Sequence, residues 1–217
     1  MRKGNALESC VYDGIRKTIR RFRERPFHYF TEADIHSSLM RDIMDGASDV
    51  LVCRPAPCVS VSLVHQEYPT NSRYSKSKLL KGYSSDEMKM TEISGKHGDR
   101  GNFDLAVLNP DFVARQFAPA ESNSPINAVR GLRAVINKDV RGAASRKMND
   151  EMCFVIEVKF IHMFNARNIQ MLKEVIQDNE KLLLAYHYSD PDSQVRPINL
   201  VFCASESLDR RDGATPV

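Results

Sequence analysis

The stretch "FVIEVKF", Phe154–Phe160, places two opposite charges inside an otherwise apolar run. Alternate side chains of a β-strand point to the same face, so Glu157 and Lys159 would lie side by side while their apolar neighbours face a core. A carboxylate and an ammonium group therefore share one spot on the strand. Two interpretations are open: an ion pair on a half-exposed strand, or a catalytic site.

Asp104 interrupts a second apolar run, "FDLAVL", in the same way. It shares its face with Ala106 and Leu108, and an unpaired carboxylate there would cost several kilocalories per mole in desolvation. If the two strands are neighbours, Asp104 and Glu157 repel each other, which raises a pKa unless a divalent cation holds both ionised. Hard oxygen ligands with open positions for water suit Mg²⁺. The alternative for Asp104 is a hydrogen bond to the "GDRGN" loop.

Hydrophobic periodicity and Pro and Gly breaks predict the other elements. Residues 8–24 predict an amphipathic basic helix that Pro26 ends. Thr31 with Asp34 predicts the capped start of a second helix, with Glu32 in its first turn. Further along the chain we expect strands at 58–69, 102–110 and 152–162, a helix at 166–187 and a strand at 198–205.

The length of 217 residues predicts one α/β domain with insertions. Residues 1–25 would form an N-terminal basic helix ahead of a domain at 26–206. Two polar segments, residues 70–101 and 111–150, are expected to be insertions, and the second contains a short helix weakened by glycines. The remaining residues, 207–217, are expected to form a flexible tail.

Composition argues against several classes of protein. Charged residues make up 27% and hydrophobic residues 42%, and no apolar run is long enough to span a bilayer. The N-terminus lacks the apolar region of a secretory signal, so we expect a cytoplasmic protein. The five cysteines are scattered, which argues against a disulfide framework. Cys53, Cys58 and His65 make only half of a metal site, so buried free thiols are the favoured interpretation.

Basic residues are concentrated in three segments. Residues 1–25 contain eight Lys and Arg against three Asp and Glu, residues 71–101 seven against four, and residues 122–149 six against one. Such segments suit a polyanionic partner, although a solvated face explains any one of them equally well.

The pattern "FDLAVLNP" followed by "IEVK", on consecutive strands after a helix that holds Glu32, resembles the PD-(D/E)XK nuclease superfamily. The signature residues here are Asp104, Glu157 and Lys159, and Glu32 matches a less regular fourth acidic position. The resemblance implies a restriction-endonuclease-like fold. This fold is a three-layer α/β core in which helices flank a central mixed four-stranded sheet, with elements in the order αβββαβ.

The resemblance covers about residues 31–204 and has two departures from the family pattern. Phe103 replaces the proline of the family name. The two acids are far apart along the chain, which an insertion at 111–150 explains.

The resemblance also implies roles for these residues. Asp104 and Glu157, with the backbone carbonyl of Val158, would bind Mg²⁺ or Mn²⁺, and the ion would lower the pKa of a bound water and neutralise charge on the scissile phosphate. Lys159 would orient that water or stabilise the pentacovalent transition state. Glu32 would hold a water or a second ion.

Three residues near these motifs have two interpretations each. Glu32 would serve the site or would only interact with the helix dipole. Glu67 would lie at the rim of the site or cap the end of a strand, and the cap is favoured. Lys181 would contact phosphate or lie on the surface, and the surface position is favoured.

Two functions from different classes are therefore expected. The first is Mg²⁺-dependent hydrolysis of phosphodiester bonds, in DNA more than in RNA. The alternative is a catalytically inactive nucleic-acid-binding or structural module of the same fold in a larger complex. Both functions leave open a homodimer or a partner protein. Both predict an affinity for nucleic acid that falls with salt, and only the first predicts metal-dependent cleavage. A protein-interaction domain would show neither behaviour.

Overall fold

The chain folds around one mixed β-sheet with the strand order β3-β4-β5-β6. β3 (Val64–Tyr74) pairs antiparallel with β4 (Asp99–Leu108), β4 antiparallel with β5 (Met152–His162), and β5 parallel with β6 (Arg196–Ala204). The expectation of an α/β fold with a mixed four-stranded sheet is confirmed. The computed structural model describes residues 3–46, 49–56, 59–74, 99–117, 151–162, 168–187 and 195–204.

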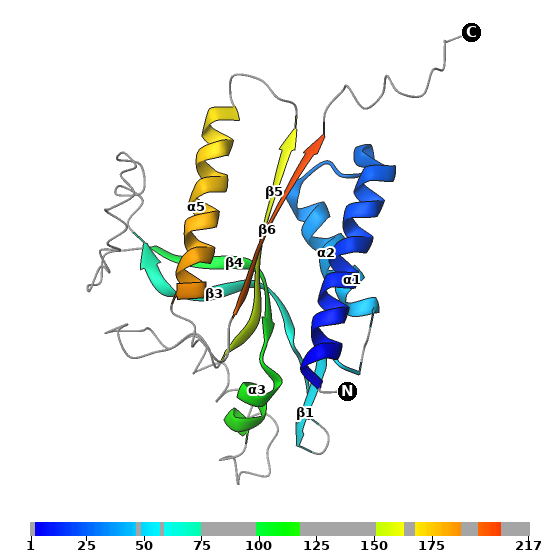
Figure 1. The fold of residues 1–217 in the computed structure, drawn as a ribbon, viewed down its shortest axis with the longest axis vertical. Helices are drawn as coiled ribbons and strands as arrows, with labels where there is room; N and C mark the ends of the chain where they lie inside the picture. The colour runs from blue at the N-terminus through cyan, green and yellow to red at the C-terminus, as the bar shows by residue number, and fades with distance from the viewer. Residues whose placement is uncertain are drawn as a thin grey trace.

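Helices lie on both sides of the sheet (Figure 1). α1 (Lys3–Glu24) and α2 (Glu32–Asp45) lie on one side, and α5 (Asn168–His187) lies on the other. Parallel strands need a crossover connection, and α5 supplies it between β5 and β6. A short 3₁₀-helix, η1 (Pro26–His28), joins α1 to α2, and α3 (Pro110–Phe117) follows β4.

The first two helices begin and end at the expected signals. α1 ends at Glu24, two residues before Pro26. Thr31 and Asp34 form a capping box, in which the Asp34 N–H donates to Thr31 Oγ1 at 3.3 Å and the Thr31 N–H donates to Asp34 Oδ2 at 2.8 Å. This cap fixes the position of Glu32 in the first turn of α2.

A β-hairpin that the sequence did not indicate precedes the sheet. β1 (Val52–Ala56) pairs antiparallel with β2 (Val59–Ser62). The single strand expected at 58–69 is therefore wrong, because the chain leaves β2 at Leu63 and enters β3 one residue later. At this break the Leu63 carbonyl accepts a hydrogen bond from the Leu108 N–H at 2.7 Å.

β3 and β4 extend into the first expected insertion. β3 continues past Pro69 to Tyr74, and β4 begins at Asp99, so both ends of the segment 70–101 are strands. β3 is at the edge of the sheet, where a proline is tolerated. α3 occupies the start of the insertion expected at 111–150. The short helix expected later in that insertion, and the tail at 207–217, lie outside the described residues.

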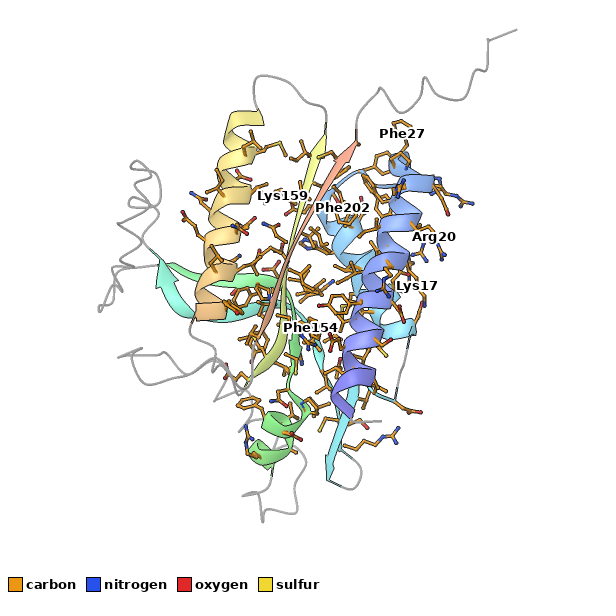
Figure 2. The ribbon with its side chains drawn as sticks, in the orientation of Figure 1. Lys17, Arg20, Phe27, Phe154, Lys159 and Phe202 are labelled. Carbon is orange, nitrogen blue, oxygen red and sulfur yellow. The ribbon has the colours of Figure 1, made fainter. Side chains whose placement is uncertain are left out.

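Aromatic contacts join α1 to Phe154 and Phe202 of the strands, both labelled in Figure 2. The ring of Tyr12 packs edge-on against Phe154 of β5 at 5.7 Å between centroids, and Phe22 packs against Phe202 of β6 at 4.9 Å. The buried residues of α1, α2 and the sheet form one apolar cluster. α1 is therefore part of the core and is not only a basic surface element.

α1 and α2 pack unusually closely. A Cβ atom at Gly14 would lie 2.6 Å from Ile43 Cα, so only glycine fits at this crossing. Beside it, the buried Asp42 accepts a hydrogen bond from Thr18 Oγ1 at 2.9 Å and forms an ion pair with Arg21 at 2.9 Å. The contact thus combines close apolar packing with one compensated buried charge.

Four of the five cysteines lie among the described residues. Four cysteines there are free thiols that are half-buried rather than fully buried: Cys10, Cys53, Cys153 and Cys203. Cys58 lies outside the described residues, and the His65 ring contacts the Ser62 carbonyl at 2.8 Å. Among the described helices, none combines the length and the apolar character needed to cross a membrane.

Candidate functional site

The candidate site lies where β4 stops pairing with β5. The two strands are in register up to Leu105 opposite Ile156. One further step along this register places Asp104 opposite Glu157, and directly opposed residues point to the same face. Lys159 follows on that face two residues later. The three signature side chains therefore converge on one side of the sheet.

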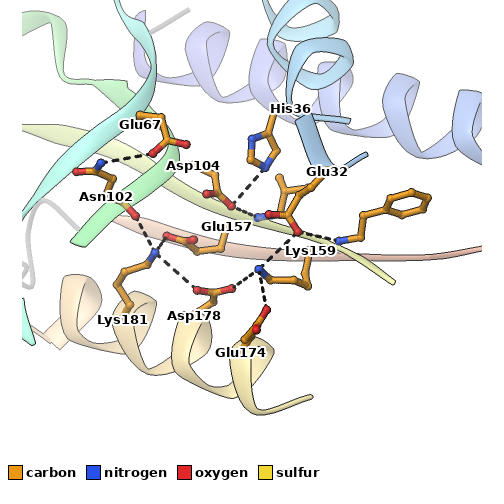
Figure 3. A network of polar contacts seen from close by, with 12 residues as sticks. Glu32, His36, Glu67, Asn102, Asp104, Glu157, Lys159, Glu174, Asp178 and Lys181 are labelled. Atoms are coloured by element: carbon orange, nitrogen blue, oxygen red, sulfur yellow. Dashed lines mark hydrogen bonds and ion pairs between the residues drawn. The ribbon is translucent and has the colours of Figure 1, made fainter. Parts of the chain in front are cut away.

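Carboxylates take the place of a partner strand beside the second half of β5 (Figure 3). The Val158 N–H donates to Asp104 Oδ2 at 2.7 Å, and the Phe160 N–H donates to Glu32 Oε2 at 3.1 Å. Because the N–H and C=O of one strand residue point to the same edge, the Val158 carbonyl faces the same side as Asp104. Two acids from different elements thus satisfy backbone groups that β4 leaves unpaired.

Glu32, His36 and Asp104 form a group that could hold a metal ion. One ligand atom from each side chain lies within 4.8 Å of the other two. Glu32 and His36 are four residues apart on α2 and therefore share a face of the helix. His36 Nε2 is buried, makes no hydrogen bond to the described residues, and lies 3.5 Å from Asp104 Oδ2. An imidazole nitrogen in this position, between two carboxylates, fits a metal ligand.

Asp104 and His36 shift each other's pKa toward the charged form of each side chain. Burial alone would raise the pKa of Asp104, but the neighbouring His36 and the Val158 N–H outweigh it and lower the pKa. Burial alone would lower the pKa of His36, but Asp104, Glu32 and Glu67 outweigh it and raise the pKa. The carboxylates beside the His36 ring therefore favour its protonated form.

Glu157 is paired with a lysine from α5. Its side chain is only 1% exposed, and Lys181 Nζ lies 2.6 Å from Glu157 Oε1. The same ammonium group donates to the Asn102 carbonyl at 2.7 Å. Burial raises the pKa of Glu157 to about 9, although Lys181 acts in the opposite direction. The expectation that Lys181 is a surface residue is wrong, because its side chain is 14% exposed and its ammonium group contacts the signature glutamate.

Lys159 is held by carboxylates from two helices. Its Nζ lies 3.5 Å from Glu32 of α2, and 3.6 Å and 3.7 Å from Glu174 and Asp178 of α5. Burial lowers the pKa of Lys159, but these carboxylates outweigh it and raise the pKa. Asp178 also lies 3.7 Å from Lys181, so it stands between the two lysines. Lys159 is therefore a fixed positive charge at neutral pH.

The four catalytic residues expected from the sequence thus belong to one network, which we call the charged cluster. It consists of Glu32, His36, Asp104, Glu157, Lys159, Glu174, Asp178 and Lys181. The metal ligands expected from the sequence were Asp104, Glu157 and the Val158 carbonyl. In the structure, Asp104 belongs to the group of possible metal ligands that also contains Glu32 and His36. Glu157 does not belong to this group and contacts Lys181 instead.

Sequence reasoning missed three members of the charged cluster. His36 could have been found from its spacing of four residues after Glu32 on one helix. Glu174 and Asp178 have the same spacing on α5, and Lys181 follows Asp178 by three residues. Helical spacing alone therefore contained the signal, but such charges are also typical of a solvated helix face.

Glu67 lies next to the cluster, within β3. The interpretation that it caps the end of a strand is wrong, because β3 continues to Tyr74. Its φ of 50° is a left-handed conformation that marks an irregular point in the strand. Glu67 Oε2 accepts a hydrogen bond from Asn102 Nδ2 at 3.4 Å, which places it at the rim.

Comparisons with protein-family models, with curated proteins and with solved structures gave no match. The arrangement of the charged cluster is therefore the evidence for function.

Proposed function

We propose that this protein is a metal-dependent nuclease that hydrolyses phosphodiester bonds, in DNA in the first place, on a restriction-endonuclease-like fold of the PD-(D/E)XK type. The observation that carries this proposal is the convergence of Asp104, Glu157 and Lys159 on one face of the sheet. These residues come from two strands and are far apart along the chain. The mixed sheet, the element order around it and the helices on both sides are compatible with that fold.

The donor set fits a divalent cation. Glu32, His36 and Asp104 would hold it, and the Val158 carbonyl lies on the same edge of β5. Two carboxylates and one imidazole suit Mn²⁺ in addition to Mg²⁺, because carboxylates favour both ions and imidazole favours transition metals. A bound cation supplies Lewis acidity, which neutralises charge on a phosphate oxygen and makes water a better nucleophile.

The lysines supply fixed positive charge beside the ligands. Lys159 is 16% exposed and is oriented by three carboxylates, so its ammonium group is held in place before a substrate arrives. A preorganised cation next to a phosphate stabilises the extra negative charge of the transition state. Lys181 places its ammonium group 2.6 Å from the buried Glu157 Oε1. In this proposal Lys159 acts on the substrate and Lys181 acts through Glu157.

The test is to measure metal binding and cleavage separately. Isothermal titration of Mn²⁺ should show binding to the wild type and a loss of about tenfold or more in affinity for Asp104→Asn and His36→Gln. Lys159→Met should bind Mn²⁺ like the wild type and should cleave a DNA substrate about a hundredfold more slowly. Asp49→Asn is the matched control, because the Asp49 side chain is 88% exposed and forms its ion pair with Arg54, which is not a member of the cluster.

Two results would contradict the proposal. One is the absence of metal binding by the wild type with DNA present. The other is cleavage by folded Asp104→Asn and Lys159→Met proteins at the rate of the wild type. Circular dichroism and thermal unfolding establish that each variant is folded.

One observation favours the second candidate, a nucleic-acid-binding or structural module without turnover. Each signature acid has a structural partner: Asp104 and Glu32 accept backbone hydrogen bonds, and Glu157 is paired with Lys181. In this second candidate the acids serve only the fold, and the protein binds nucleic acid in a salt-dependent way. It would release no cleavage product with any divalent ion.

A further inference from the structure

Two phenylalanines are exposed immediately before α2, in the segment "RPFHYF" (25–30). Phe27 is 55% exposed and Phe30 is 75% exposed, the two highest values among the exposed large apolar side chains of the described residues. Single exposed apolar side chains are common, whereas exposed apolar groups that lie close together mark candidate interaction sites. Their exposure is a property of this segment that the charged cluster does not account for.

The segment is fastened to the core between the two exposed rings. Pro26 and Tyr29 are buried, and the Tyr29 ring lies 5.4 Å from Phe22. The Phe30 N–H donates to Asp34 Oδ2 at 2.9 Å, which ties the segment to the cap of α2. Because Pro26 and Tyr29 are buried and the Phe30 N–H is bound by Asp34, the backbone that carries the two exposed rings is attached to the core.

Basic residues are concentrated in the part of the chain that leads up to these rings. The segment from Arg16 to Phe30 contains six Lys and Arg and a single acidic residue, Glu24. Arg23, Arg25 and His28 are all exposed. Figure 2 shows Phe27 at the end of α1, with Arg20 and Lys17 along the outer side of the same helix. Aromatic rings among positive charges are typical of surfaces that bind unpaired nucleic acid, because bases stack on the rings and phosphates pair with the cations.

The segment also leads directly into the charged cluster. Glu32 follows Phe30 by two residues and accepts the hydrogen bond of the Phe160 N–H. Phe22, which supports Tyr29, also packs against Phe160 at 5.9 Å between centroids. The same short stretch of chain therefore carries the exposed rings at one end and a candidate metal ligand at the other.

We infer that Phe27 and Phe30 form a stacking platform for unpaired nucleobases, and that the substrate class of this protein is single-stranded nucleic acid. The binding part of this inference stands on the exposed rings and the charges around them. The delivery of the bound strand to the charged cluster rests on the proposed function. The phosphates of the strand pair with Arg23 and Arg25 while its bases stack on the two rings.

The test measures binding in the presence of EDTA, so that its outcome does not depend on metal binding or cleavage. Fluorescence anisotropy compares a short labelled oligothymidylate with a duplex of the same length. Phe27→Ala and Phe30→Ala should each weaken single-strand binding about tenfold, as expected for one base–ring stacking contact. Duplex binding should stay unchanged, and Leu172→Ala, which removes a 48% exposed apolar side chain from α5, should have no effect.

Further variants separate stacking from charge and from folding. Phe30→Trp should retain single-strand affinity, because it keeps an aromatic face. The double variant Phe27→Leu with Phe30→Leu should lose it, although it keeps apolar side chains. Arg23→Ala and Arg25→Ala should reduce the dependence of affinity on salt, whereas the phenylalanine variants should leave that dependence unchanged.

Three outcomes would overturn the inference. The first is single-strand binding by Phe27→Leu/Phe30→Leu that equals the wild type, and the second is a loss of duplex binding in the ring variants as large as their loss of single-strand binding. The third is that the ring variants lose only binding to anionic lipid vesicles, measured in parallel, and keep their single-strand binding. Cleavage assays are read separately. If binding depends on the two rings but no divalent metal ion supports cleavage, the proposed function is contradicted and the stacking platform is supported. If cleavage depends on metal but the ring variants bind single strands like the wild type, the stacking platform is contradicted and the proposed function is supported.

Discussion

A single carboxyl group, Glu157, links protonation to stability in this protein. Its pKa rises from the ordinary value of 4.5 to about 9 because of burial. Between pH 4.5 and about pH 9, the folded state therefore keeps a proton on Glu157 that the unfolded state has released. The contribution of this proton to stability is complete below pH 4.5 and is lost as the pH rises toward 9.

Replacement of Glu157 by glutamine should remove this pH dependence. Glutamine has nearly the same shape as the protonated acid and cannot ionise. Without metal ions, the free energy of unfolding of the wild type should fall relative to Glu157→Gln as the pH rises, by at most about 1.4 kcal/mol per pH unit for one proton. Urea unfolding of both proteins over a pH series measures the difference, and parallel curves would contradict the raised pKa.

Residues of the charged cluster differ in how well the sequence reveals them. Asp104, Glu157 and Lys159 were identifiable because each interrupts an apolar strand pattern, where a charge needs a reason. Asp178 and Lys181 belong to an amphipathic helix, where charged residues are the rule on the solvent side. Only the packing of α5 against β5 decides that these particular charges face inward, and that packing is not a local property of the sequence.

At the scale of elements, the contact of α1 with α2 depends on the absence of a side chain at Gly14. A Cβ atom there would lie 2.6 Å from the backbone of Ile43, which cannot move without shifting α2. Alanine favours a helix over glycine by about 1 kcal/mol, but overpacking of this kind costs about 1–3 kcal/mol. The crossing therefore selects glycine against the preference of the helix.

Gly14→Ala should lower the free energy of unfolding by about 1–2 kcal/mol, because the steric cost exceeds the gain in helix propensity. Gly46→Ala is the matched control: its Cβ atom would have its nearest contact at 3.5 Å, an ordinary van der Waals distance. Chemical denaturation of the two variants provides the comparison. Equal stability of Gly14→Ala and the wild type would show that the helices do not cross this closely.

Elements were predictable where a pattern is local, and were missed where it is not. The strand at 152–162 and the cap at Thr31 agree with the sequence because alternation and capping chemistry act over a few residues. The hairpin of β1 and β2 was missed because Pro55 lies inside β1, and proline is a weak strand former. The pairing of β3 with β4 beyond Pro69 comes from the partner strand, which no local pattern specifies.

At the scale of the whole molecule, α1 closes one side of the core. It covers apolar residues of α2, β5 and β6 that would otherwise meet water, among them Ile43, Phe160 and Phe202. The sequence suggested a separate basic helix at 1–25 because its charged face is more conspicuous than its apolar stripe. Two properties, a basic outer face and a buried inner one, are therefore combined in one helix.

Deletion of residues 1–25 should abolish cooperative unfolding, because the apolar residues under α1 lose their cover. Thermal unfolding followed by circular dichroism should show a broad transition or aggregation in place of a single sigmoidal curve. Replacement of the exposed Arg16 and Arg20 by serine should leave the transition cooperative, since it alters only the outer face. A truncated protein that unfolds cooperatively would show that α1 is an appendage.

The backbone hydrogen bonds from β5 to Asp104 and Glu32 have an evolutionary consequence. Under the proposed function, a descendant freed from catalysis would still be selected to keep both acids, because their loss leaves strand amides unsatisfied. Among the described residues, His36 Nε2 makes no such bond and lies 3.5 Å from Asp104 Oδ2. Among descendants that have become inactive, position 36 is therefore where we expect sequence drift to begin.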